Sequence, residues 1–140
     1  RMILRDMTSW LDRSPGFREY LEGTVLIPVP LHRRRLGKRG FNQSEWIAHS
    51  FRKAVGPSVE VMDILKREKN TPTQTELDRS ERKVNVKNAF ALKRRNCLRK
   101  EDRIMLIDDV FTTGATLNAC AQVLRDHGFK RINIATLGHG

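Results

Sequence analysis

Residues 104–116 read IMLIDDVFTTGAT, and this stretch decides how the rest of the chain is arranged. The four apolar residues 104–107, bounded by charges, predict a short strand that is buried on both faces. Asp108 and Asp109 follow at the carboxyl end of this strand, and a threonine-rich loop with one glycine comes next. The loop leads into a helical pattern whose apolar stripe consists of Leu117, Cys120, Ala121 and Leu124.

A strand, a tight loop and a helix in this order suit a bound phosphate. Backbone N–H groups converge in front of a helix N-terminus, and the helix dipole favours an anion there. Gly114 lets the backbone approach a ligand closely, because it has no side chain in the way. The predicted phosphate loop comprises Val110, Phe111, Thr112, Thr113, Gly114, Ala115 and Thr116.

The two acids in front of the loop narrow the choice of ligand. A nucleotide-binding P-loop carries a lysine beside the phosphates, and residues 108–116 contain no Lys or Arg. Adjacent carboxylates would repel a phosphate unless they face hydroxyl donors or a bound Mg²⁺, which either Asp108 or Asp109 is suited to contact. Each feature alone also fits a helix cap or an ordinary turn. The whole stretch in order predicts a sugar phosphate with free hydroxyls, together with magnesium.

Length and cysteine content set the broad class. A chain of 140 residues with 39% hydrophobic content predicts one domain, residues 1–140. No apolar window is long enough to span a membrane, and no stretch resembles a signal peptide. Cys97 and Cys120 lack C-x-x-C spacing, so we expect no zinc knuckle and a reducing, cytoplasmic location. The chain starts at Arg1 rather than Met, as a piece of a longer protein would.

The chain is strongly basic, with a formal net charge of +11 from 27 Lys and Arg against 16 Asp and Glu. An anionic ligand accounts for a few arginines, and the others suit either a solvated surface or attraction to nucleic acid. Aromatic residues make up only 6% of the chain and do not alternate with basic ones, so no stacking platform for single strands is predicted. Nucleic-acid binding is therefore a secondary hypothesis.

The remaining pattern alternates helices and strands. Residues 1–23 predict a helical segment, and Asn42, with Glu45 three residues later, predicts the capped start of a helix that stops at Gly56. Strands are predicted at 24–30, 59–65, 89–92 and 131–137, the first ending near Pro28 and Pro30 and the second lying near a sheet edge. This alternation predicts an α/β fold with a parallel sheet, whose ligands bind at the carboxyl ends of the strands.

Two motifs resemble a known family. Residues 104–116 resemble the signature of type I phosphoribosyltransferases, and residues 27–31 (IPVPL) with 35–43 (RLGKRGFNQ) resemble the ComF family. These competence-associated, amidophosphoribosyltransferase-like proteins match the chain over residues 25–137. The resemblance implies a three-layer, Rossmann-like sheet flanked by helices, with a flexible hairpin arm. Members often carry an amino-terminal zinc-binding segment, which we expect to be absent here.

The resemblance also implies roles for particular residues. Asp108 and Asp109 would contact the 2- and 3-hydroxyls of phosphoribosyl pyrophosphate (PRPP), and the loop after them its 5-phosphate. Arg35 and Arg39 would contact the pyrophosphate, because guanidinium groups bind phosphate oxygens in a bidentate fork. Residues 66–88 would form a flexible loop that closes over the reacting centre, unless they form an exposed hairpin without ligand contact. The loop residues that match the family pattern include Arg67, Thr71, Gln74 and Arg82.

The implied reaction is a Mg²⁺-dependent transfer of the phosphoribosyl group from PRPP to an unidentified nitrogen acceptor, with release of pyrophosphate. Such an enzyme belongs to nucleotide metabolism. The alternative is a non-catalytic accessory protein of DNA uptake that associates with PRPP or single-stranded DNA, with nucleic acid or DNA-uptake proteins as partners. A base-salvage enzyme fits less well, since no base-binding segment follows Leu137. A homodimer is a further expectation.

Overall fold

The computed structural model describes residues 15–30, 42–68, 89–93, 98–111 and 114–139. Within these ranges no helix has the length and apolar character needed to cross a membrane. The elements in chain order are α2 (Pro15–Leu21), β1 (Thr24–Pro28), α4 (Gln43–Val55), β2 (Glu60–Val61), β3 (Leu65–Arg67), β4 (Phe90–Leu92), β5 (Arg103–Phe111), α6 (Ala115–Asp126) and β6 (Ile132–His139).

A parallel sheet with the strand order β2-β1-β5-β6 forms the centre of the fold. The pairing of β1 with β5 runs from Thr24 opposite Arg103 to Pro28 opposite Ile107. β1 and β5 lie inside the sheet, so their apolar residues are buried on both faces, as predicted for residues 104–107. The parallel sheet confirms the predicted α/β class.

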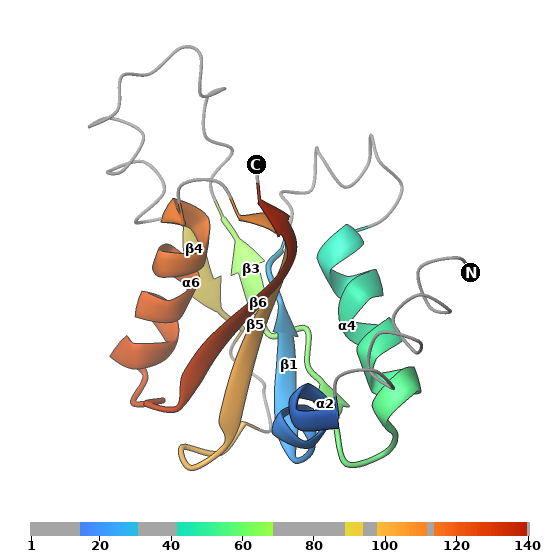
Figure 1. The fold of residues 1–140 in the computed structure, drawn as a ribbon. Coiled ribbons are helices and arrows are strands. Elements are labelled where there is room, and N and C mark those ends of the chain that lie inside the picture. The colour runs from blue at the N-terminus through green and yellow to red at the C-terminus, as the bar shows by residue number, and fades with distance from the viewer. Residues whose placement is uncertain (1–14, 31–41, 69–88, 94–97, 112–113, 140) are drawn as a thin grey trace.

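Helices cover both faces of this sheet (Figure 1). On one face, α6 and the β3–β4 ribbon bury Leu117 and Phe90 against alternate strand residues such as Leu106. On the other face, α4 and α2 bury Phe51 and Leu21 against the intervening strand residues. All four residues of the α6 stripe predicted from periodicity are buried: Leu117, Cys120, Ala121 and Leu124. Ala119 is buried with them. The three-layer arrangement is therefore confirmed.

The prediction of one strand over residues 59–65 is wrong. Only Glu60 and Val61 pair with β1, and the Met62 N–H donates to the Leu26 carbonyl before the chain leaves the sheet. Leu65 then begins β3, which pairs antiparallel with β4 in a separate two-stranded sheet. Burial of Ile64 and Leu65 against the α6 side of the core accounts for this departure, because it turns the chain toward the other face.

The predicted flexible loop begins too early for the same reason. Lys66 and Arg67 lie in β3, where Arg67 pairs with Phe90. The ribbon formed by β3 and β4 holds the two ends of the intervening segment together, as a hairpin arm requires. Thr71, Gln74 and Arg82 of the predicted loop lie outside the described residues, as do Arg35 and Arg39.

Candidate functional site

The acid pair lies within β5 rather than after it. Pairing between β1 and β5 ends at Ile107, whose carbonyl accepts the Val29 N–H at 2.9 Å. On the other side of β5, pairing with β6 continues through Asp108 to Phe111. The strand was predicted to end after residue 107. Pairing with β1 does end there, but pairing with β6 continues to Phe111, so the prediction is wrong on the β6 side. Asp108 and Asp109 occupy the short length of β5 that extends beyond β1.

Val110 and Phe111 were predicted to belong to the phosphate loop, and both lie in β5 instead. Their backbones pair with Gly138 and His139 of β6. Because β6 is long enough to offer partners up to His139, the ladder continues past the two acids that follow the apolar run 104–107. Thr112 and Thr113 of the predicted loop lie outside the described residues.

The Asp108 carboxylate is held by two hydrogen bonds to one of its oxygens. Asp108 Oδ1 accepts the backbone N–H of Asp109 at 2.9 Å and the hydroxyl of Ser44 at 3.2 Å. Ser44 belongs to α4 and is 4% exposed, while Asp108 is half-buried. Ser44 was not recognised as a site residue from the sequence. The only indication in the sequence was its position two residues after the predicted N-cap, Asn42.

The pKa of Asp108 is raised from 3.8 to about 6, mainly by burial and also by the neighbouring Asp109 carboxyl. The hydrogen bonds from the Asp109 N–H and the Ser44 hydroxyl act in the opposite direction and are outweighed. Ionised Asp108 is therefore poorly compensated in this structure at neutral pH. A ligand that brings hydroxyl donors or a cation to the acid pair would relieve this cost.

Asn42 fixes the start of α4 beside the acid pair. Its side-chain oxygen accepts the Ser44 N–H at 3.1 Å, which confirms the predicted N-cap. Its amide nitrogen donates to the Val29 carbonyl at 3.0 Å, so the cap also binds the chain just after β1. The predicted capping partner, Glu45, places its carboxylate 3.9 Å from His49 Nε2.

Gly114 is the N-cap of α6 and has a left-handed backbone with φ 78°. A residue with a Cβ would be strained in this conformation, which explains the glycine at this position. Ala115 and Thr116 begin the helix, and no acidic residue lies in its first turn. The positive end of the α6 dipole thus meets no competing carboxylate from its own first turn.

Arg67 lies on the α6 side of this region. Its guanidinium carbon is 5.4 Å from the centre of the Phe90 ring. Burial raises the pKa of the Cys120 thiol, the Asp108 charge raises it further, and the Arg67 charge lowers it. The charges of Asp108 and Arg67 thus act in opposite directions on the pKa of the same buried thiol of α6.

The acid pair fits magnesium bound together with a substrate. Among the described residues no group of three or more His, Cys, Asp or Glu side chains gathers as a cage for a metal ion. Mg²⁺ commonly uses one or two carboxylates plus substrate phosphates, and retains several waters. Asp108 supplies a carboxylate whose negative charge is poorly compensated, and the carboxyl group of Asp109 lies next to it, which suits that mode of binding.

Comparison with known proteins agrees with this geometry. The chain matches the phosphoribosyl transferase domain family over residues 38–139. It is 37% identical over 111 residues to competence protein F of Haemophilus influenzae, covering 79% of this chain and 48% of that protein. It is 36% identical over 110 residues to DNA utilization protein YhgH of Escherichia coli K12, covering 78% and 46%.

The competence protein ComFC of Streptococcus pneumoniae is 32% identical over 124 residues, with coverage of 89% of this chain and 51% of that protein. The chain thus spans about half the length of the curated relatives it matches. The matched domain, the parallel three-layer fold and these relatives agree with one another. The chain belongs to the phosphoribosyl transferase domain family and, within it, to the ComF family.

Proposed function

We propose that this chain binds PRPP at the carboxyl edge of its sheet and transfers the phosphoribosyl group to a nitrogen acceptor, releasing pyrophosphate. One observation carries the proposal. The half-buried acid pair of β5 lies within one strand–loop–helix unit with the glycine-capped start of α6. Carboxylates suit the diol of a ribose, and a helix N-terminus suits its phosphate. Membership of the phosphoribosyl transferase domain family supports the same ligand.

In the proposed reaction, the protein mainly orients its reactants. Asp108 and Asp109 accept hydrogen bonds from the ribose hydroxyls, while the start of α6 holds the 5-phosphate. The bond from C1 to pyrophosphate breaks ahead of nitrogen attack, so positive charge grows on the ribose beside the two acids. Holding PRPP and the acceptor in line supplies a large part of the rate enhancement.

The leaving pyrophosphate needs positive charge. Arg35 and Arg39 are proposed to supply it, since a preorganised guanidinium stabilises charge that develops on phosphate oxygens. Bound magnesium would neutralise pyrophosphate charge, with Asp108 or Asp109 as its candidate protein contacts. Thr71, Gln74 and Arg82 are proposed to close over the site and exclude water.

Calorimetry with PRPP and Mg²⁺, followed by a pyrophosphate-release assay with a panel of bases and amines, tests the proposal. Saturable PRPP binding and acceptor-dependent release of pyrophosphate are expected. Binding without release by any acceptor would favour a non-catalytic, PRPP-dependent accessory protein. A wild-type protein that neither binds PRPP nor gains thermal stability from it would overturn the proposal.

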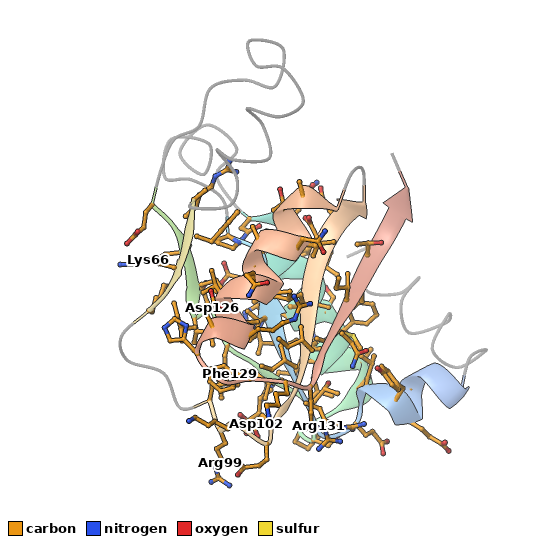
Figure 2. All side chains as sticks on the ribbon, turned by 90° about the vertical axis from the view of Figure 1, so that its left-hand side faces the viewer. Lys66, Arg99, Asp102, Asp126, Phe129 and Arg131 are labelled. Atoms are coloured by element: carbon orange, nitrogen blue, oxygen red, sulfur yellow. The ribbon has the colours of Figure 1, made fainter. Side chains whose placement is uncertain are left out.

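Nucleic-acid binding is a second candidate function. Exposed basic residues lie near the amino-terminal ends of β5 and β6, opposite the acid pair, and Figure 2 shows Arg99 and Arg131 there. Two of the relatives are called competence protein F and DNA utilization protein YhgH. In this proposal the chain acts in the cytoplasm with DNA-uptake proteins, as a monomer or a homodimer.

The salt dependence of DNA binding tests this candidate. If phosphate contacts drive it, affinity for single-stranded DNA should fall steeply between 50 and 200 mM salt. Arg99→Ala together with Arg131→Ala should weaken it, whereas Asp108→Asn should leave it intact. DNA binding that is insensitive to salt and to both arginines would contradict the candidate.

A further inference from the structure

A closed circuit of hydrogen bonds surrounds the end of β1. The Val29 N–H donates to the Ile107 carbonyl at 2.9 Å, and the Val29 carbonyl accepts Asn42 Nδ2 at 3.0 Å. Asn42 Oδ1 accepts the Ser44 N–H at 3.1 Å, and the Ser44 hydroxyl donates to Asp108 Oδ1 at 3.2 Å. Asp108 follows Ile107 in β5, so the circuit joins β1, α4 and β5.

The circuit constrains the orientation of one carboxylate. Asp108 Oδ1 accepts two hydrogen bonds, from Ser44 and from the Asp109 N–H, which use both of its lone pairs. Neither bond involves Oδ2, the oxygen that we assign to a hydroxyl hydrogen of a ligand. The Asp109 side chain also hydrogen-bonds to the Asp108 carboxyl group, so a ligand hydroxyl would compete with it. Because Ser44 is 4% exposed and its N–H is fixed by the helix cap, its hydroxyl has little freedom to choose another acceptor.

We propose that Ser44, held in place by Asn42, is a positioning residue that orients the Asp108 carboxylate toward the ribose diol and thereby favours ribose over deoxyribose ligands. This inference rests on the proposed function, because it assumes that Asp108 accepts ribose hydroxyls. It adds α4 to the recognition of the sugar, a role that neither Asn42 nor Ser44 had in the sequence prediction.

A purely structural role for the Ser44 hydroxyl is the competing explanation. Ser50 provides a matched comparison on the same helix. It is 7% exposed, and its hydroxyl donates to the Trp46 carbonyl at 2.8 Å, within α4 itself. Removing either hydroxyl deletes one hydrogen bond of a buried serine, and only the Ser44 bond reaches the acid pair.

The test compares ribose 5-phosphate with 2-deoxyribose 5-phosphate by calorimetry. These ligands differ in one of the hydroxyls that the acid pair is proposed to contact. Ser44→Ala should weaken the binding of ribose 5-phosphate about tenfold and that of 2-deoxyribose 5-phosphate about twofold, as expected for the loss of a hydrogen bond to a charged group. Ser50→Ala should leave both affinities unchanged, and Ser44→Thr, which keeps the hydroxyl, should retain the preference for ribose.

Further outcomes separate the inference from the function beneath it. Equal losses for both ligands in Ser44→Ala, or no loss, would overturn the positioning role alone. Wild-type protein that binds neither sugar phosphate would overturn the proposed function and this inference with it. If Ser44→Ala does not fold, the ratio of the affinities for ribose 5-phosphate and 2-deoxyribose 5-phosphate is measured in Asn42→Ser instead. This variant keeps a helix cap and removes the amide donor to Val29. A smaller preference for ribose supports the circuit, and an unchanged preference contradicts it.

Discussion

Pro28 is the last residue of β1 in register with β5, and its partner is Ile107, the residue directly before the acid pair. The Val29 N–H still donates to the Ile107 carbonyl, so the chain keeps one hydrogen bond to β5 beyond Pro28. The carbonyl of Leu26, two residues before Pro28, faces β2, so the donor that proline lacks would have pointed to β2 and its absence helps to end that ladder. On the other side of β5, pairing with β6 continues to Phe111. Because β1 ends early, Asp108 lies beside the start of α4, where the Ser44 hydroxyl donates a hydrogen bond to its carboxylate.

Asp108→Asn should weaken PRPP binding in the presence of Mg²⁺ about 10- to 100-fold and abolish pyrophosphate release. The reason is that an amide replaces a charged acceptor, and hydrogen bonds to charged groups contribute about 1.5–3 kcal/mol. Calorimetry and a pyrophosphate assay measure the two effects. Asp126→Asn is the control, since Asp126 is exposed at the end of α6 and accepts from Gln122. Wild-type affinity in Asp108→Asn would contradict the assignment.

The raised pKa of Asp108, about 6 against an ordinary 3.8, also predicts how stability depends on pH. The folded protein holds this proton more tightly than the unfolded chain, so the group stabilises the fold below about pH 4. That contribution is lost as the pH rises through about 6. Asp108→Asn cannot ionise, and it should exceed the wild type in free energy of unfolding at pH 7.5 by about 1–2 kcal/mol, an estimate discounted for partial solvent screening.

Denaturant unfolding in EDTA at pH 7.5 and at pH 4 measures this difference. The gap between variant and wild type should be largest at pH 7.5 and should shrink toward pH 4. A variant that is less stable than the wild type at pH 7.5 would mean that ionised Asp108 is well compensated in the folded state.

Gly114→Ala should both destabilise the fold and weaken sugar-phosphate binding. The left-handed backbone at φ 78° costs a residue with a Cβ about 1–2 kcal/mol, and relief of this strain would displace the N–H groups at the start of α6 that are proposed to hold the phosphate. Gly56→Ala is the matched control. Gly56 also has a positive φ, 121°, with no atom within 4 Å of an added Cβ, and it caps the far end of α4. It should lose stability and keep wild-type affinity for ribose 5-phosphate.

Cys120 should resist alkylation in the folded protein. Burial and the Asp108 charge raise its pKa, so little thiolate forms, and the side chain is fully buried. Iodoacetamide at pH 8 should label the Cys120 peptide far more slowly in buffer than in denaturant, as measured by mass spectrometry. Comparable rates under the two conditions would show that α6 opens readily at this position.

The sequence alone determined the elements whose pattern is local. The apolar run at 104–107, the stripe on α6 and the Asn42 cap follow from periodicity and nearest-neighbour chemistry, and all three are present. The family, too, was recognisable from short contiguous motifs. Such features depend on residues within a few positions of one another, so a linear reading can find them.

Only the tertiary structure decided where pairing ends and which distant groups meet. β5 continues through Val110 and Phe111 because β6 offers partners there, and Arg67 joins a strand because Phe90 pairs with it. Ser44 donates to Asp108 across 64 positions of sequence, because β1 ends before Asp108 and α4 begins beside the part of β5 that extends beyond β1. Hydrogen bonds between segments depend on how the chain packs in three dimensions, and that packing has no local signature in the sequence.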